Sequence, residues 1–242
     1  MSPTITDASV GLDLSRDGTP ESAWLEALSA LAAQQPPVGR RVVVVGPHPD
    51  DETLGVGGII SMLAAAGASV SLVLLSDGEA ASDEADLAER RHVELLHALA
   101  ILGGGTSITT DCLHLPDGDI AAHADAAAGA LSAILGRDDV VLAPLENDGH
   151  CDHDAAGAIS RRVCEATGAA LWFYPVWAWH WHRPETSDIV ARGVRVPLSL
   201  AAIDAKQQAL QCFTSQFTGD APVVPADMLA RSRRPFEVLV RP

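Results

Sequence analysis

The feature that most constrains the fold of this chain is an alternation of short apolar runs with longer helical segments. The run Arg41-Val42-Val43-Val44-Val45-Gly46 stays apolar after its first residue, as in a strand buried on both faces of a sheet. A helix over 54–66 follows it, and Gly67 ends that helix. Strands that alternate with helices of this length indicate an α/β fold, with a mostly parallel sheet and helices on both faces.

The alternation continues along the chain. After the first strand, we expect further strands over 68–75, 107–113, 139–143 and 170–174, and helices over 84–102, 120–135 and 152–167. In the last third, a helix over 200–212 lies between two edge or antiparallel strands, 193–197 and 237–241. In sheets of this kind, ligands bind outside the carboxyl ends of the strands, so the loops there are expected to meet in one crevice.

The whole chain, residues 1–242, is expected to form a single domain. Its 242 residues, 48% of them apolar, suffice for one sizeable core, and no linker or internal repeat interrupts them. Residues 1–39 are expected to form an irregular leader and one helix, over 23–34.

Charge and cysteine usage exclude several classes of protein. The formal net charge is −16, and an acidic surface of this size repels nucleic-acid phosphates and anionic lipids. The four cysteines are irregularly spaced, which argues against a disulfide framework and an all-cysteine zinc site. Residues 1–10 do not resemble a signal peptide, and no run of about 18 apolar residues could span a membrane. We therefore expect a cytoplasmic protein that does not bind nucleic acid.

Titratable side chains crowd the loop after the first strand, which reads Pro47-His48-Pro49-Asp50-Asp51-Glu52. Close carboxylates repel one another unless a cation or a proton lies between them. Capping of the helix that follows is an alternative explanation, because acidic side chains are favoured in a first helical turn.

A second cluster, Asn147-Asp148-Gly149-His150-Cys151-Asp152-His153-Asp154, follows the strand over 139–143 and opens another helix. Its two histidines lie three positions apart, at the same expected edge of the sheet as the first cluster. Imidazole and carboxylate groups together indicate a divalent-metal site, and zinc is the default ion for such a mixed set.

A catalytic zinc site has three protein ligands and one open position for water. His48 is one candidate ligand; the others are one of Asp50 and Asp51 and one of His150 and His153. The unused carboxylate and imidazole would then serve as base and as stabiliser of developing charge. Spacing alone does not say which member of each pair binds the metal.

Residues 47–52 and 150–153 together resemble the paired motifs of the PIG-L (LmbE-like) zinc N-deacetylases. The resemblance implies a Rossmann-like sheet and removal of an acetyl group from an N-acetylglucosamine unit of a small glycoconjugate. It also implies a ligand set for Zn²⁺, namely His48, Asp51 and His153.

The same resemblance assigns the remaining polar residues. Asp50 becomes the general base, and His150 stabilises the oxyanion or protonates the leaving amine. Asp152 is then expected to orient the imidazole of His150. One departure from the family pattern is Cys151, which stands where the family usually has Pro.

Weaker similarities extend the resemblance over residues 41–216, through segments near Gly55, Lys206 and Ser215. Arg91 and Asp117 match family positions that contact the substrate. Each also has an ordinary structural explanation, because Arg91 can pair with a neighbouring acid on its helix and Asp117-Gly118 can form a turn.

Four of the five tryptophans fall within residues 172–181. Aromatic faces stack on sugar rings, but tryptophan is also enriched in packed cores and subunit interfaces. This Trp-rich segment is therefore expected to form either a substrate wall or an interface between copies of the chain.

One other function is excluded, and others remain as alternatives. Dinucleotide binding is excluded, because the segment Gly55-Val56-Gly57-Gly58 lacks the third small residue of the dinucleotide-binding fingerprint, since residue 60 is Ile. A non-haem iron(II) oxygenase is a stronger alternative, because His48, Asp50 and His153 satisfy a two-His-one-carboxylate triad. A two-metal phosphoesterase and a metal-bearing binding protein without turnover are further alternatives, and metal content and product release discriminate among them.

Overall fold

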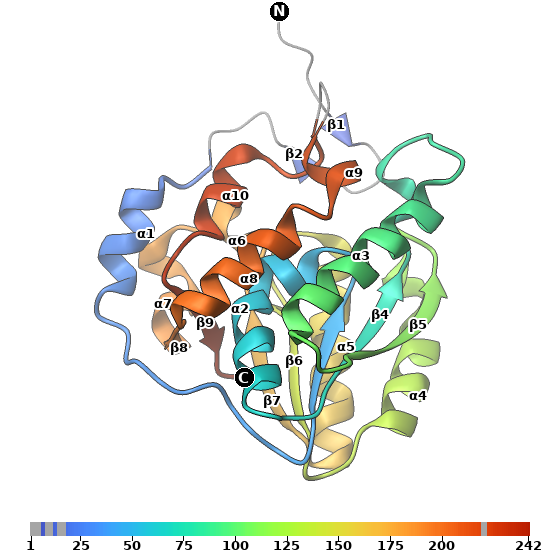
Figure 1. Cartoon of the computed structure of the whole chain (residues 1–242), viewed down its shortest axis with the longest axis horizontal. Helices are drawn as coiled ribbons and strands as arrows, with labels where there is room; N and C mark the ends of the chain where they lie inside the picture. Colours follow the sequence, from blue (N-terminus) through green and yellow to red (C-terminus); the bar gives the residue numbers. More distant parts are fainter. Residues whose placement is uncertain (1–5, 8–11, 14–17, 219–221) are drawn as a thin grey trace, which may run out of the picture.

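The fold is a seven-stranded sheet with helices packed on both faces (Figure 1). The computed structural model describes residues 6–7, 12–13, 18–218 and 222–242. The sheet has the strand order β5-β4-β3-β6-β7-β9-β8. The first five of these strands run parallel to one another, whereas β9 pairs antiparallel with both β7 and β8. The α/β prediction is therefore confirmed, including the antiparallel strands of the last third.

The bounds of the strands are β3 Val42–Gly46, β4 Val70–Ser76, β5 Thr109–Leu115, β6 Val140–Pro144, β7 Ala170–Tyr174, β8 Gly193–Pro197 and β9 Phe236–Val240, with a separate short pair, β1 Thr6–Asp7 and β2 Leu12–Asp13. The longer helices are α1 Glu21–Leu28, α2 Asp51–Ala65, α3 Leu87–Gly103, α4 Ala124–Ile134, α5 Cys151–Thr167 and α8 Leu200–Leu210. Shorter helices are α6 Ala178–Trp181, α7 Asp188–Arg192, α9 Thr214–Phe217 and α10 Ala226–Arg231, and the 3₁₀ turns are η1 Glu79–Ala81, η2 Ile120–His123 and η3 Pro184–Thr186.

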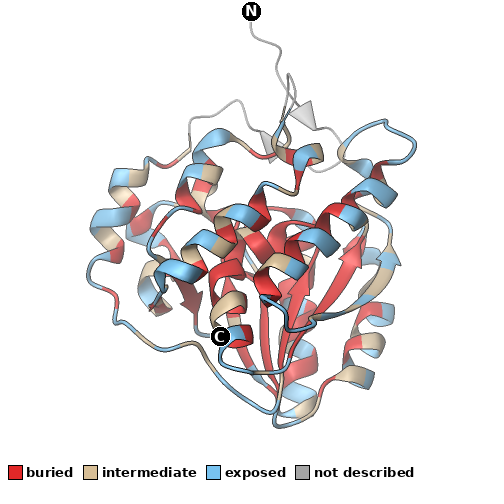
Figure 2. Ribbon diagram, viewed as in Figure 1, coloured by how far each residue is buried: buried red, intermediate tan, exposed pale blue. Residues whose placement is uncertain are grey.

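The valines of β3 explain why that strand is apolar throughout. Val42 and Val44 belong to the core on one face of the sheet, whereas Val43 and Val45 belong to the core on the other face. Helices α2, α3 and α8 cover the first face and α5 lies behind the second, so the strands are buried from both sides (Figure 2). Only a strand enclosed in this way requires an apolar residue at every position.

Several element boundaries differ from the expected ones. Helix α2 begins at Asp51, three residues earlier than expected, so Asp51 and Glu52 lie in its first turn. Helix α1 ends at Leu28, and the chain after it forms a parallel bridge from Ala33 to Arg195 of β8. The expected helix over 120–135 is the turn η2 followed by α4. Much of the expected leader, residues 1–5, 8–11 and 14–17, lies outside the described residues.

A buried ion pair supports a break in helix α2. Val56 has the non-helical dihedrals φ −137° and ψ 19°. Glu237 of β9 accepts the N–H groups of Gly58 and Ile59 at 2.8 Å, and Lys206 of α8 donates to the carbonyl of Leu54 at 2.8 Å. Lys206 Nζ also lies 2.6 Å from Glu237 Oε1. These two side chains therefore satisfy backbone groups on both sides of the break.

In the part of the chain that the structure describes, no helix combines the length and the apolar composition needed to cross a bilayer. All four cysteines are free thiols.

Candidate active site

The candidate site lies where the strand order reverses, between β3 and β6. The chain leaves β3 toward β4 on one side, and β6 lies on the other, so their carboxyl ends are where ligands bind in sheets of this kind. The first cluster, residues 47–52, follows β3, and the second cluster, residues 147–154, follows β6. The expectation that the two clusters meet at one edge of the sheet is therefore confirmed.

Three side chains from these two loops converge closely enough to hold one metal ion. Asp51 Oδ2 lies 3.2 Å from His48 Nδ1 and 3.2 Å from His153 Nε2. All three residues are buried, and His153 Nε2 has no hydrogen-bond partner among the described residues. A buried imidazole nitrogen without a hydrogen bond beside a carboxylate fits a cation well, because an ion supplies the missing partner. The donor set of two nitrogens and one oxygen suits zinc and other borderline divalent ions.

Carboxylates hold the outer nitrogens of both histidines. His153 Nδ1 lies 2.8 Å from Asp148 Oδ2. His48 Nε2 lies 3.0 Å from both Asp152 Oδ2 and Asp117 Oδ1. Metal-binding histidines commonly have such carboxylate partners, which fix the ring and increase the basicity of the ligating nitrogen. This pattern independently supports a metal between His48, Asp51 and His153.

A second set around His48 fits an ion less well. His48, Asp117 and Asp152 also approach one another. However, Asp152 accepts the N–H groups of Gly118 at 2.7 Å and Ile120 at 3.1 Å, and Asp117 accepts the N–H of Ala80 at 3.0 Å. Asp152 Oδ2, the oxygen that faces His48, is thus already hydrogen-bonded to the backbone.

The electrostatics of the three converging groups favour the charged carboxylate. Burial alone would raise the pKa of Asp51, but the charges of His153 and His48 and their close approach to its carboxylate lower it well below the usual range. Burial alone would lower the pKa of His153, yet Asp51 and Asp148 raise it to about 9. Without an ion, the negative charge of this cluster attracts protons onto its histidines; a metal would take their place.

Asp50 lies beside this cluster in a strained conformation. Its φ of 132° lies in a region that favours glycine, and such strain is commonly retained at functional positions. Burial raises the pKa of its carboxyl to about 8, although the nearby charge of Arg91 acts in the opposite direction. A carboxyl with a pKa near neutrality can exchange a proton with a reacting group at physiological pH.

His150 caps the start of α5 through its ring. Its Nδ1 accepts the backbone N–H of Asp152 at 3.1 Å, so the neutral ring carries its proton on Nε2. Burial, followed by the charges of His153 and His48, lowers the pKa of His150 to about 2. The imidazole is therefore a neutral hydrogen-bond donor. Its ring centroid lies 4.8 Å from that of His153 and 5.0 Å from that of His48.

The expected contact from the Asp152 carboxylate to the His150 ring differs from the one observed. The carboxylate turns toward His48 and the N–H groups of Gly118 and Ile120, and only the backbone of Asp152 meets His150. The physical reason is the position of Asp152 in the first turn of α5, where its side chain points to the neighbouring loop. The observed contacts make Asp152 a support for His48.

Arg91 and Asp117 both contact the cluster from the side. Arg91 donates to the carbonyls of Gly78 and Pro49 at 2.8 Å and lies 3.4 Å from Asp50 Oδ1. The expected surface pair between Arg91 and its helical neighbour Glu94 is not formed, because Glu94 accepts hydrogen bonds from residues 214–215 instead. A substrate-binding role for Arg91 and Asp117 remains a prediction.

The Trp-rich segment divides between the site and the core. Trp177 is buried, and its ring centroid lies 6.2 Å from that of His150. Trp181 packs against Gly149, where an added Cβ would lie 2.6 Å from the indole. Trp179 instead contacts Trp24 at 4.9 Å, inside the molecule. Association of copies of the chain through this segment remains a prediction.

No pattern in the sequence predicts a role for Asp148, although the structure places it between His153 and the Trp-rich segment. Asp148 is completely buried and accepts the N–H groups of residues 176, 177 and 178 at 2.8–3.0 Å. Its position in the loop between β6 and α5, two residues before His150, is the one sequence feature that indicates a place near the site.

Cys151 lies at the edge of the site. Its side chain is exposed, and Sγ lies 3.9 Å from the carbonyl oxygen of Gly118. The partial desolvation of the thiol, followed by the charge of Asp152, raises its pKa, so it remains protonated at neutral pH. The substitution leaves His150 and His153 in place around it.

Comparisons with known proteins identify relatives of this chain. The family model described as PIG-L: GlcNAc-PI de-N-acetylase matches residues 43–164. A 1D-myo-inositol 2-acetamido-2-deoxy-alpha-D-glucopyranoside deacetylase of Rhodococcus erythropolis is 31% identical over 194 residues, which is 68% of this chain and 65% of that protein. A protein of the same name from Mycobacteroides abscessus is 35% identical, over 52% of this chain and 56% of that protein. The chain thus spans about half to two thirds of the length of these curated relatives.

Solved structures agree on the fold. The conserved protein TT1542 from Thermus thermophilus is similar with a TM-score of 0.66 and 30% identity, over 83% of this chain and 94% of that one. The N,N'-diacetylchitobiose deacetylase from Pyrococcus horikoshii has a TM-score of 0.62 and 21% identity, over 90% of this chain and 85% of that one.

Proposed function

This chain belongs to the PIG-L family, and from that premise we propose that it is a zinc-dependent hydrolase that removes the acetyl group from an N-acetylglucosamine-type small glycoconjugate. The single observation that carries this proposal is the convergence of His48, Asp51 and His153, each buried and two of them held by outer carboxylates. The relatives that match by sequence are named as deacetylases of such a glycoside.

His48, Asp51 and His153 would hold the ion. A bound divalent ion of this kind lowers the pKa of water and polarises a carbonyl oxygen. The two imidazoles are well suited to this task because Asp148, Asp117 and Asp152 fix their orientation. Asp51 is the charged member of this set, so a divalent ion and its three ligands together would carry a charge of +1, with the carboxylates of Asp148, Asp117 and Asp152 nearby.

Asp50 is proposed as the general base. Its carboxylate accepts a proton from the water that attacks the acetyl carbonyl. The raised pKa of Asp50, about 8, allows it to retain this proton and then pass it to the departing nitrogen. The amide C–N bond breaks, and the products are acetate and the free amine of the sugar. A carboxyl with this pKa is mostly protonated at pH 7. The charge of a divalent ion held by the neighbouring Asp51, together with Arg91 at 3.4 Å, would favour the ionised form of Asp50 that the first step requires.

His150 is proposed to stabilise the developing oxyanion. Its Nδ1 is already hydrogen-bonded to the backbone, so the Nε2–H group is the donor that remains for the substrate oxygen. The family resemblance implied two roles for His150, oxyanion stabilisation and protonation of the leaving amine. A neutral imidazole supports the first of these roles better than the second.

The substrate is proposed to be a neutral or cationic small molecule. Asp77, Glu79 and Asp119 surround the carboxyl ends of β4 and β5, in a chain with a formal net charge of −16. These carboxylates disfavour phosphate-rich ligands, and the absence of nucleic-acid binding stays a prediction.

The proposal is tested by metal replacement and product analysis. Protein stripped with a chelator should release no acetate from N-acetylglucosaminides, and one equivalent of Zn²⁺ should restore the release. The iron(II) oxygenase alternative, which none of the comparisons supports, predicts instead that iron restores activity with consumption of oxygen. A protein that binds zinc tightly but releases no acetate from any acetamido sugar would contradict the proposal.

A further inference from the structure

A histidine near the carboxyl end of β5 adopts a backbone conformation that usually belongs to glycine. His114 has φ +51°, and apart from Asp50 it is the one non-glycine residue with positive φ in the described part of the chain. The left-handed conformation is energetically unfavourable for an ordinary side chain. Histidine tolerates this region better than most residues, but glycine occupies it at lower cost. The side chain at this position therefore imposes a cost on the fold that needs a separate explanation.

The strain comes from a bulge in the sheet. Leu74 of β4 pairs with Cys112 of β5, whereas Ser76 pairs with Leu115, so β5 contains one more residue than β4 between these pairs. Bulges near functional sites commonly redirect a side chain. Here the bulge brings the imidazole of His114 to Asp77, which directly follows β4.

The two side chains form a close pair at an exposed position. His114 Nδ1 lies 2.8 Å from one carboxylate oxygen of Asp77 and 3.1 Å from the other. The side chain of His114 is 65% exposed and that of Asp77 is 23% exposed. An exposed ion pair contributes little to stability. It does not offset the backbone cost of His114, so the fold alone does not account for the pair.

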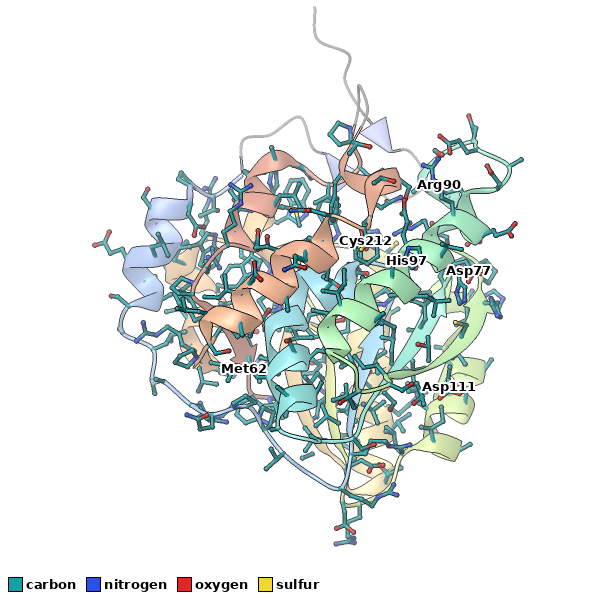
Figure 3. The ribbon with its side chains drawn as sticks, viewed as in Figure 1. Met62, Asp77, Arg90, His97, Asp111 and Cys212 are labelled. Atoms are coloured by element: carbon teal, nitrogen blue, oxygen red, sulfur yellow. The ribbon has the colours of Figure 1, made fainter. Side chains whose placement is uncertain are left out.

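This pair borders the candidate active site. Residue 78, next to Asp77, accepts a hydrogen bond from Arg91, which contacts Asp50. Three residues after His114, Asp117 contacts His48. Figure 3 shows Asp77 near the tips of β4 and β5, whereas Asp111 lies farther from the tips. The pair is therefore tied by short segments to both the proposed base and a proposed metal ligand.

On these grounds we infer that His114, oriented by Asp77, is a specificity-determining residue that binds a hydroxyl group of the substrate beyond its acetamido sugar. This inference rests on the proposed function. Because Asp77 occupies Nδ1, the exposed Nε2 is left to meet a ligand, and an imidazole nitrogen can donate to or accept from a hydroxyl. The acidic side chains nearby, Asp77, Glu79 and Asp119, disfavour an anionic group. A polyol or a second sugar ring has the required chemistry.

The test compares two substrates that differ only in hydroxyl groups. One is the α-glycoside of N-acetylglucosamine with inositol, and the other is its glycoside with cyclohexanol, which has the same ring size. The wild-type protein should have a higher kcat/KM for the inositol glycoside. In His114→Gly, this ratio of kcat/KM values should fall by about 2- to 10-fold, the effect of one net hydrogen bond. The melting temperature of His114→Gly should stay the same or rise, because glycine adopts positive φ without strain.

Asp77→Ala provides a second variant, since it leaves His114 in place without its carboxylate partner. It should also lower the ratio, mainly through KM for the inositol glycoside. Asp111→Ala is the matched control, because it removes the same charge from an exposed position of β5 farther from the tips. Its ratio should equal that of the wild type.

The outcomes separate this inference from the proposed function. Release of acetate from neither glycoside would contradict the proposed function itself. Acetate release from both, with a wild-type ratio near one or a ratio unchanged in His114→Gly, would overturn the inference and leave the proposed function standing. A clear loss of thermal stability in His114→Gly would overturn it as well, since the side chain would then serve the fold.

Discussion

Asp148 Oδ2 lies 2.8 Å from His153 Nδ1, and the same carboxylate accepts three consecutive backbone N–H groups from residues 176–178. One buried side chain thus orients a proposed metal ligand and fixes residues 176–178, in the second half of the Trp-rich segment. The loop after β6 and the loop after β7 are therefore coupled through a single carboxylate. Trp177, which begins this second loop's helical turn, lies next to His150 as a result.

Replacement of Asp148 should weaken metal binding. In Asp148→Asn, His153 loses its negatively charged partner, and the metal affinity should fall by about 10- to 100-fold. Competition with a chromogenic chelator measures this change. Activity should recover at saturating metal if the loss acts through affinity. Asp125→Asn, on the exposed surface of α4, is the control and should bind metal normally; an unchanged affinity in Asp148→Asn would contradict the role.

Replacement of the proposed base should separate catalysis from metal binding. Asp50→Asn should keep the metal, since Asp50 is outside the converging set, and should lower kcat by about two to four orders of magnitude. Metal content by mass spectrometry and acetate release measure the two properties. Turnover at the wild-type rate would reject Asp50 as the base.

The two histidines of the second cluster should behave differently. His153→Ala removes a nitrogen from the converging set and should lose the metal. His150→Ala should retain the metal, because His150 is not one of the three proposed ligands and its Nδ1 accepts a backbone N–H group. Its kcat should fall by about 100- to 1,000-fold, as when an oxyanion donor is removed. Retention of metal by His153→Ala with loss in His150→Ala would exchange their roles.

Asp139 should contribute stability that depends on pH. Burial alone would raise its pKa, but hydrogen bonds from Arg41, Gly136 and Arg40 lower it. A carboxyl with a lowered pKa stabilises the fold above its unfolded pKa, about 3.9, and this stabilisation is lost as the pH falls through the folded pKa. Asp139→Asn should therefore be less stable than the wild type at pH 7 by about 1–3 kcal/mol. The difference should shrink below about pH 4. Urea unfolding at several pH values tests this, and a difference independent of pH would contradict it.

The buried pair of Lys206 and Glu237 should be strongly coupled. Both side chains are at most 4% exposed, so removing one partner leaves a buried, unpaired charge. Glu237→Gln should lower the free energy of unfolding by about 3–5 kcal/mol. The double variant with Lys206→Met should lose less than the sum of the two single losses, by about 0.5–3 kcal/mol. Additive losses would show that the two groups act independently.

The fold was predictable because the strands carry a strong local pattern. Residues 42–45 are apolar throughout since both faces of β3 are covered, and this pattern does not depend on distant contacts. Boundaries were less predictable. The acidic residues of the first motif suggested a loop, but Asp51 and Glu52 begin α2, because negative charge is favoured in a first turn.

The three proposed metal ligands were predictable only in part. Spacing indicated both clusters, and the family resemblance chose the set that the structure brings together, His48, Asp51 and His153. The partners of these residues were not predictable, because they depend on three-dimensional contacts. Asp152 contacts His48, which is 104 positions away, rather than its neighbour His150. The short helices between residues 178 and 231 likewise lack the periodicity that identifies longer helices.

The break at Val56 divides α2 into two parts with different surroundings. The first turn carries Asp51 and follows the end of β3, whereas the remainder ends at the exposed residues Ala65 and Ala66. Glu237 and Lys206 anchor the chain between these parts. In a variant whose native exposed Cys151 is replaced by Ser, cysteine substitution at Ala65 or Ala66 therefore offers an attachment point for a fluorophore or a solid support, at the end of the helix opposite the chemistry.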